Sequence, residues 1–142
     1  MTLHDEPVLD AALRLALAFL LVLPIGWERE NRSRSADLRT YPLLSVCVCG
    51  FLLLAQRGIG EPGEQADVFF GMLTGIGFVG SGAIVKSPEG AGGLSTAISL
   101  WVTGAVGAGV AYGTPLISAA LSLMSVVGLW APSLVKRRRA SS

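Results

Sequence analysis

The chain has 142 residues, of which 51% are hydrophobic and 15% are charged, and its mean hydropathy is +0.60. A soluble domain of this size carries about 25% charged residues, so the composition predicts a single domain embedded in membrane lipid. The formal net charge of +1 excludes a strongly basic nucleic-acid-binding protein, and no nucleic-acid partner is expected.

Five apolar segments follow one another along the chain, over residues 8–26, 41–56, 67–85, 94–112 and 115–135. Each is near the roughly 17–25 residues that a helix needs to cross the hydrocarbon layer. Because lipid satisfies no backbone hydrogen bonds, such segments must be helical. We therefore predict an all-α, polytopic membrane protein, with a single domain over residues 1–142 and a bundle of about five transmembrane helices.

The basic residues predict how these helices are oriented. With five spans, one side of the membrane receives Arg29, Arg32, Arg34, Arg39, Lys86, Lys136, Arg137, Arg138 and Arg139. Arg57 falls on the other side, and four or six spans would break this segregation. Because cytoplasmic loops are rich in Lys and Arg, we expect an outside N-terminus and a cytoplasmic basic tail over residues 136–142. The residues ahead of the first segment are acidic, unlike the start of a signal peptide, so we expect that segment to be retained.

Cap and turn signals mark the ends of the second and third segments. Thr40 is a candidate N-cap of the second helix, and Pro42 is tolerated in its first turn. Residues 87–90 read Ser-Pro-Glu-Gly, which is a good turn sequence. We expect this short turn to join the third and fourth helices as an antiparallel hairpin.

Glycine crowds the third segment, at Gly71, Gly75, Gly77, Gly80 and Gly82. Residues 75–80 match GxGxxG, but the match lies within a membrane span rather than between a strand and a helix, so a dinucleotide site is not expected. The glycines predict close packing by neighbouring helices on several faces, with Gly71 and Gly75 forming a GxxxG pair. The alternative is a broken helix whose carbonyl groups coordinate an ion.

Small hydroxyl side chains form a stripe on the fourth segment. Thr96, Ser99 and Thr103 fall with Gly107 within an arc of about 80° of the helix, and Ser95 stands at its start. One interpretation is hydrogen bonding between helices. The other is a lining for a polar ligand or an ion path, and the sequence leaves both open.

Charged residues gather at the two ends of the first segment. Asp10 and Arg14 are four residues apart and so pair on one helical face. At the other end we expect a polar cluster at the cytoplasmic face, made by Glu28, Arg29, Glu30, Asp37, Arg39 and Thr40. The alternative is a solvated loop that only sets the topology. Glu28 and Glu30 are the candidate ligands for weakly held Mg²⁺, and no other cofactor is expected. Cys47 and Cys49 are interpreted as small packing residues.

The ordered set of these motifs resembles the membrane domain of the MgtC/SapB family. The resemblance is carried by Gly26, Glu28-Arg29-Glu30, Leu38-Arg39-Thr40, the run GIGFVGSGAI over residues 75–84, GLSTA over residues 93–97, and Trp101. It covers the chain from about residue 13 to residue 112. Asp37 departs from the pattern, since the family commonly has Gly there. Long members carry a soluble C-terminal domain, and this sequence ends at a basic tail, so roles that require that domain are not expected.

The resemblance implies a multi-pass protein of the bacterial inner membrane, linked to magnesium homeostasis, growth in low magnesium, virulence and modulation of the ATP synthase. We expect a regulator that acts through contacts with another membrane complex or with itself as a homo-oligomer. An oligomeric cation or small-solute transporter is the alternative. An enzyme is not expected, because the sequence contains no Ser/His/Asp or metal-ligand constellation.

Overall fold

The computed structural model describes residues 5–31, 37–87 and 90–140, with side chains for residues 8–31, 37–84 and 92–131. The helices are α1 (Asp5–Glu30), α2 (Thr40–Gly58), α3 (Pro62–Gly82), α4 (Leu94–Ala111) and α5 (Pro115–Ala140). Two short antiparallel strands, β1 (Val85–Ser87) and β2 (Gly90–Gly92), lie between α3 and α4. The predicted all-α class with five helices is confirmed, with this small hairpin added.

Three of the helices are long and apolar enough to cross a membrane, over Val8–Glu30, Thr40–Gly58 and Leu94–Ala111. Residues Pro115–Ala131 of α5 form a shorter apolar helix. In α3, Glu64 and Asp67 near the start and the many glycines lower the hydropathy. The chain is therefore a membrane protein with several apolar helices.

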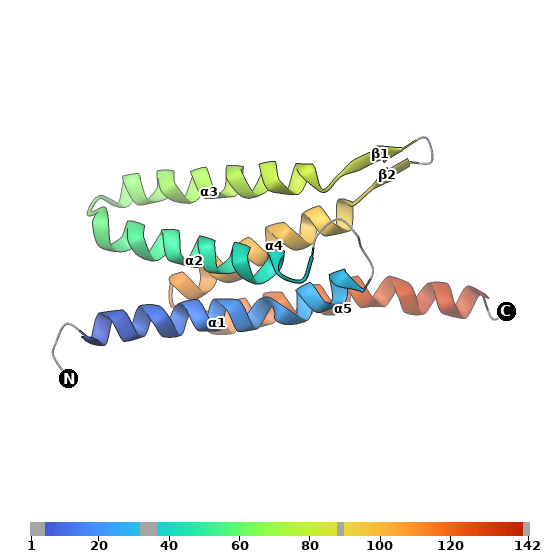
Figure 1. Cartoon of the computed structure of the whole chain (residues 1–142), viewed down its shortest axis with the longest axis horizontal. Coiled ribbons are helices and arrows are strands. Elements are labelled where there is room, and N and C mark those ends of the chain that lie inside the picture. The colour runs from blue at the N-terminus through green and yellow to red at the C-terminus, as the bar shows by residue number, and fades with distance from the viewer. Residues whose placement is uncertain (1–4, 32–36, 88–89, 141–142) are drawn as a thin grey trace.

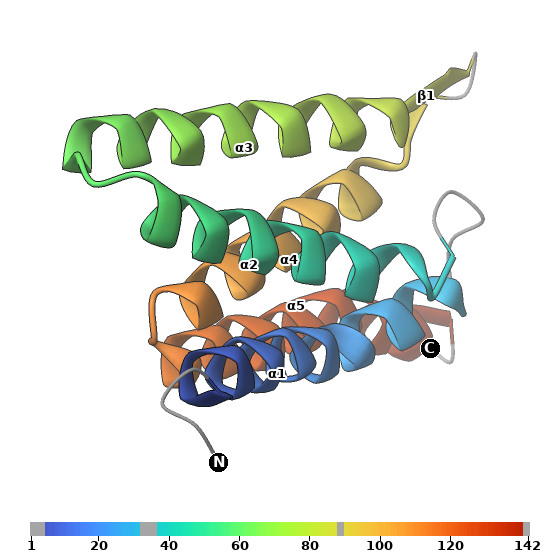
Figure 2. The same cartoon turned by 60° about the vertical axis from the view of Figure 1, so that its left-hand side comes forward.

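The helix α4 lies at the centre of the bundle, where it contacts all four other helices. Figure 1 shows α1 and α5 side by side along one edge, with α2 and α4 between them and α3. In the rotated view α3 stands apart from α1 and α5, and α4 crosses the bundle obliquely (Figure 2). The bundle is thus a core of α1, α2, α4 and α5, with α3 at its edge.

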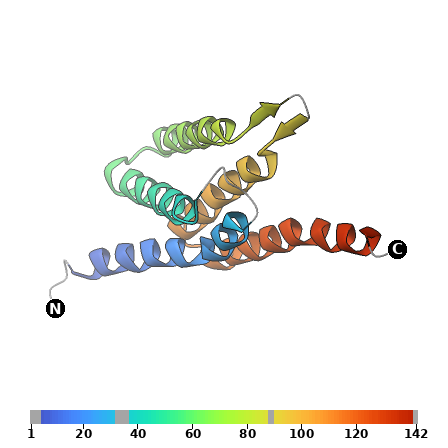
Figure 3. The ribbon, with the colours of Figure 1, turned by 45° about the vertical axis from the view of Figure 1, so that its right-hand side comes forward.

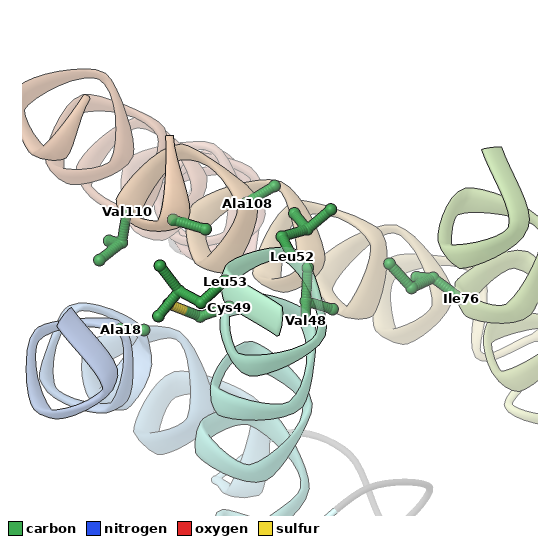
Figure 4. Close-up of a cluster of buried hydrophobic side chains, with 9 residues drawn as sticks. Ala18, Val48, Cys49, Leu52, Leu53, Ile76, Ala108 and Val110 are labelled. Atoms are coloured by element: carbon green, nitrogen blue, oxygen red, sulfur yellow. The ribbon is translucent and has the colours of Figure 1, made fainter. Parts of the chain in front are cut away.

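Buried apolar side chains hold α1, α2 and α4 together. Ala18 of α1, Cys49 and Leu52 of α2 and Ala111 of α4 are at most 1% exposed and belong to one cluster, whose α2 members lie between α1 and α4 in Figure 4. Cys49 is a packing residue, as predicted. Cys47 is exposed, so the same prediction was wrong for it, because two helix positions two residues apart face different sides.

The connection between α3 and α4 differs from the expected turn. The third segment was predicted over residues 67–85, but α3 begins at Pro62 and ends at Gly82. Proline fits the first turn of a helix, where its missing N–H leaves no bond unmade. Val85 then pairs with Gly92 in the β hairpin, which projects beyond the ends of α3 and α4 in Figure 3. Two paired strands therefore join the helices in place of the predicted turn, whose central residues 88–89 lie outside the described residues.

The start of α2 also differs from the expectation. Thr40 is the first residue of the helix, and Arg39 occupies the N-cap position with helical φ and ψ and no side-chain cap. The prediction that Thr40 is the N-cap was therefore wrong. A backbone hydrogen bond from Thr40 N to Asp37 O, at 2.9 Å, begins the turn instead, and Pro42 lies in the first turn as expected.

Candidate functional site

The end of α1 and the start of α2 meet around Gly26. A side chain at this position would lie 3.0 Å from Leu38 Cδ1 and 3.4 Å from Tyr41 Cδ2. Glycine therefore lets the segment before α2 pack directly on the backbone of α1. This contact brings together two stretches that the sequence analysis had singled out, residues 26–30 and residues 38–40.

Glu28 and Arg29 form a buried ion pair beside this contact. Each residue is 7% exposed, and Arg29 Nε lies 3.6 Å from Glu28 Oε2. Tyr41 is fully buried nearby, in the cluster with Val22 and Ile25 of α1. Within the described part of the chain its hydroxyl makes no hydrogen bond. Because breaking a buried pair leaves an uncompensated charge, we expect Glu28 and Arg29 to be sensitive to substitution.

The rest of the predicted polar cluster is not assembled around this pair. Glu30, Asp37 and Arg39 are exposed, and among the described residues they form no ion pair. The prediction that Glu30 and Arg39 meet Glu28 was therefore wrong. The reason is helical geometry: positions 28 and 30 point to different sides of α1, so burying Glu28 turns Glu30 towards the outside.

The same geometry bears on the candidate magnesium ligands. Glu28 is buried and Glu30 is exposed, so the two carboxylates do not face one space. The described residues hold no group of three or more His, Cys, Asp or Glu side chains that could bind a metal ion. Mg²⁺ at this end of α1 therefore remains an expectation that rests on the sequence.

The hydroxyl stripe of α4 faces the interior. Thr96, Ser99 and Thr103 are at most 2% exposed, while Ser95 is exposed. Ser99 Oγ donates to Ser95 O at 2.6 Å, and Thr103 Oγ1 donates to Ser99 O at 2.8 Å. These bonds stay within α4, so the interpretation as bonds between helices was wrong for Ser99 and Thr103.

Two hydroxyl hydrogen bonds between helices come instead from serines of α5, which the sequence analysis missed. Ser118 Oγ donates to Val106 O of α4 at 2.9 Å, and Ser122 Oγ donates to Leu21 O of α1. Both serines are buried. Their spacing of four residues in an apolar segment is the same signal that identified the α4 stripe, and it could have identified these two residues.

Asp10 and Arg14 pair as predicted, with Arg14 Nε 2.8 Å from Asp10 Oδ2. Arg14 also donates from Nη1 to Ala111 O at 3.0 Å, and Gln56 Nε2 donates to the same oxygen at 3.4 Å. Residues of α1 and α2 thus meet at the last carbonyl group of α4. This arrangement is structural, since it satisfies a helix C-terminus that lacks intrahelical partners.

The glycines of α3 take up different positions. Gly80 is buried against Ala97 of α4, with 3.5 Å between an added Cβ and Ala97 O, and Gly77 approaches Trp101. Among the described residues, an added Cβ meets nothing within 4 Å at the other three predicted positions, Gly71, Gly75 and Gly82. The prediction that neighbouring helices pack against several faces of α3 is therefore wrong for a single copy of the chain. The broken-helix alternative is also wrong, because α3 runs unbroken from Pro62 to Gly82.

An open groove borders the uncovered face of α3. It has a volume of about 420 Å³, and its lining from α2 and α3 includes Phe51, Gly71, Met72, Gly75 and Val79. Phe70 and Phe78 of α3 are 67% and 80% exposed. The face of α3 that points away from α4 is thus apolar, rich in small residues and uncovered.

Comparison with known proteins shows which family the chain matches. The model of the MgtC family matches residues 15–138. The chain is 38% identical over 125 residues to Protein MgtC of Brucella abortus (strain 2308), covering 87% of this chain and 51% of that protein. It is 31% identical over 102 residues to the Putative magnesium transporter YhiD of Escherichia coli (strain K12), covering 67% of this chain and 47% of that protein.

Protein MgtC of Salmonella typhimurium (strain 14028s / SGSC 2262) is 35% identical over 95 residues, which cover 67% of this chain and 40% of that protein. The chain thus spans about half the length of the relatives it matches or somewhat less. No solved structure matches it. Because the family model matches well over half of the residues, the chain belongs to the MgtC family.

Proposed function

We propose that this chain is a five-span protein of the bacterial inner membrane that supports adaptation to low magnesium as a regulator. It acts by binding another membrane protein or a second copy of itself through α3. The N-terminus lies outside and the basic end of α5 lies in the cytoplasm, because this arrangement places nearly all loop and tail cations on one side. The chain is not an enzyme in this proposal.

The uncovered face of α3 is the observation that carries the proposal. An added Cβ at Gly71 or Gly75 meets no atom of the described residues within 4 Å, although glycines at this spacing let helix backbones approach closely. Apolar side chains alone would suit contact with lipid equally well. The combination of a GxxxG pair with an open groove on the edge helix favours contact with another helix.

The link to magnesium is supported by the name of one relative. The name of the Escherichia coli relative describes that protein as a putative magnesium transporter. We extend the link to magnesium, but not the transport step, to this chain. Two buried features favour this choice: the Glu28 carboxylate lies against Arg29, and Ser99 and Thr103 already donate their hydroxyl hydrogens within α4.

The test is growth of a deletion strain in low magnesium, complemented with the wild-type chain or with Gly75→Leu. We expect the wild type to restore growth and Gly75→Leu to fail, while the variant still inserts and keeps its fold. Gly128→Leu is the matched control, since Gly128 of α5 is exposed and an added Cβ there also meets no atom of the described residues within 4 Å. Rescue by Gly75→Leu, or normal assembly of this variant on a native gel, would contradict the proposed role of α3.

A cation or small-solute transporter is the second candidate, favoured by the name of the Escherichia coli relative. It predicts flux into proteoliposomes that contain the purified chain. It also predicts that Thr103→Val, which removes a hydroxyl from the buried stripe of α4, lowers that flux. Absence of flux under a Mg²⁺ gradient, together with rescue of growth by the same chain, would favour the regulator.

A further inference from the structure

The outward face of α3, at the edge of the bundle (Figure 2), has a projecting side chain on one side and a groove on the other. A line through the exposed Gly71 and Gly75 divides the two. At about 100° per residue, Phe78 lies about 40° to one side of the midpoint of these glycines, and Val79 lies about 60° to the other side. Phe78 is 80% exposed. Val79 and Gly75 line the groove of about 420 Å³ between α2 and α3.

The ring of Phe78 and the groove lie at the same depth along α3. Phe78 follows Gly75 by three residues, about 4.5 Å along the helix axis. Because long side chains of a helix lean towards its N-terminus, the ring reaches the level of Gly75. Phe51 of α2, which is 59% exposed, lines the opposite wall of this groove. The groove therefore offers an apolar space, with one aromatic wall, at the depth of the projecting ring.

A second copy of the chain brings the projecting ring and the groove together twice. All copies enter the membrane in one orientation, because their basic loops stay on the cytoplasmic side. Two copies therefore pair about a twofold axis along the membrane normal, with their α3 helices parallel and the same face of each in contact. This symmetry places residues from one side of the glycine line beside residues from the other side of the line in the second copy. Phe78 of each copy thus meets the groove of the other, whereas a lipid chain would fill the groove and offer no space for Phe78.

We propose that two copies of the chain form a parallel dimer in the membrane. The two α3 helices cross at Gly71 and Gly75, where the missing side chains let the backbones approach closely. Phe78 of each copy packs against Phe51 in the groove of the other. This inference names the partner of the α3 face, and so it rests on the five-span arrangement and the role of α3 proposed above.

The charges of α3 oppose this dimer weakly. Glu64 and Asp67, near the start of the helix, are exposed and lie within about 60° of the glycine line. The dimer therefore brings four carboxylates towards one another at the outer surface of the membrane, where water and salt screen their repulsion. Neutralising one of them should strengthen the dimer, whereas it would weaken the binding of a partner that carries a basic residue at this depth.

The test is Förster energy transfer between copies of the purified chain in phosphatidylcholine vesicles, over a range of protein-to-lipid ratios. The donor and acceptor dyes are attached to Gly60→Cys in a background with Cys47→Ser and Cys49→Ala. We expect energy transfer that falls as lipid dilutes the chain. Phe78→Ala should lower the affinity by about tenfold, because two aromatic contacts are lost at once, and it should fold, since Phe78 is 80% exposed. Asp67→Asn should raise the affinity.

The matched control is Phe70→Ala. Phe70 is 67% exposed on the same helix but lies about 120° from the glycine line, so its loss should leave the affinity unchanged. Energy transfer no greater than random proximity gives, equal effects of Phe78→Ala and Phe70→Ala, or a weaker dimer with Asp67→Asn would each overturn the inference. If the chain is monomeric and Gly75→Leu still fails to restore growth in low magnesium, the dimer is wrong and α3 binds a different membrane protein. If the dimer forms and Gly75→Leu restores growth, the proposed function is wrong and the dimer stands.

Discussion

Gly107 sets how closely α2 and α4 approach each other. An added Cβ at this position would overlap the Ser45 carbonyl oxygen of α2 and lie 3.1 Å from Ser45 Oγ. Ser45 is fully buried, and its backbone belongs to a helix, so it cannot move aside without shifting α2. The residue at position 107 therefore determines the helix spacing in the core.

We predict that Gly107→Ala lowers the free energy of unfolding by about 1–3 kcal/mol, as overpacking does in other cores. The measurement is an SDS unfolding titration of the purified chain in mixed micelles. Gly75→Ala is the matched control on the uncovered face of α3, where the new methyl group meets no atom of the described residues within 4 Å. It should leave stability unchanged or raise it, by up to about 1 kcal/mol, because alanine favours the helix. Equal effects of the two substitutions would disprove the tight crossing.

At the scale of single residues, the sequence indicated which face of α4 is buried but not how its polar groups are satisfied. The spacing of Thr96, Ser99 and Thr103 predicted a common face, and all three are buried. The partner of each hydroxyl depends on its rotamer and on the distance to the next helix, and a periodic pattern contains neither. Ser99 and Thr103 consequently bond within their own helix, while Ser118 bonds across from α5.

At the scale of elements, the start of α4 depends on a left-handed glycine. Gly93 is the N-cap residue of α4 with φ of 84°, and an added Cβ would overlap the Ala83 carbonyl oxygen. This conformation turns the chain out of β2 and into α4. Gly113, with φ of 73°, has the same type of conformation between α4 and α5, but an added Cβ there would lie an ordinary 3.7 Å from Arg14 Nη1.

We predict that Gly93→Ala destabilises the chain more than Gly113→Ala does. Both variants place a side chain at positive φ, which costs about 1–2 kcal/mol, and the first adds a clash with backbone. The measurement is the thermal midpoint of each variant in the same detergent. An equal or larger loss at Gly113 would show that the contact of Gly93 with Ala83 does not hold the end of α3 against the start of α4.

Helices were predictable from the sequence where a crossing of the hydrocarbon layer requires an apolar segment of a certain length. Apolar segments near the length of a membrane helix located α1, α2, α4 and α5 with starts within a few residues. The β hairpin was not predictable, because strands of three residues have no measurable periodicity and this pairing depends on the positions of α3 and α4. For the same reason hydropathy extended the third segment to residue 85, whereas β1 already begins at Val85.

For the whole molecule, the side of the membrane on which Thr114 lies distinguishes five crossings from an arrangement in which α3 does not cross. Thr114 lies between α4 and α5 and is exposed, and Gly60, between α2 and α3, is exposed as well. If all five helices cross, these two positions lie on the same side, opposite to Asp37. If only α1, α2 and α4 cross, α3 stays on the outer side, and α4 then carries Thr114 to the side of Asp37.

We predict that five helices cross, so single cysteines at positions 60 and 114 should react with a membrane-impermeant maleimide on intact spheroplasts. A single cysteine at position 37 should react only after lysis. The experiment needs a background with Cys47→Ser and Cys49→Ala, because Cys47 is exposed. Labelling at position 60 but not at 114 would show that α3 does not cross and lies along the membrane surface. The groove beside α3 would then face the head groups, where a helix with exposed Phe70 and Phe78 binds the interface rather than a partner within the bilayer.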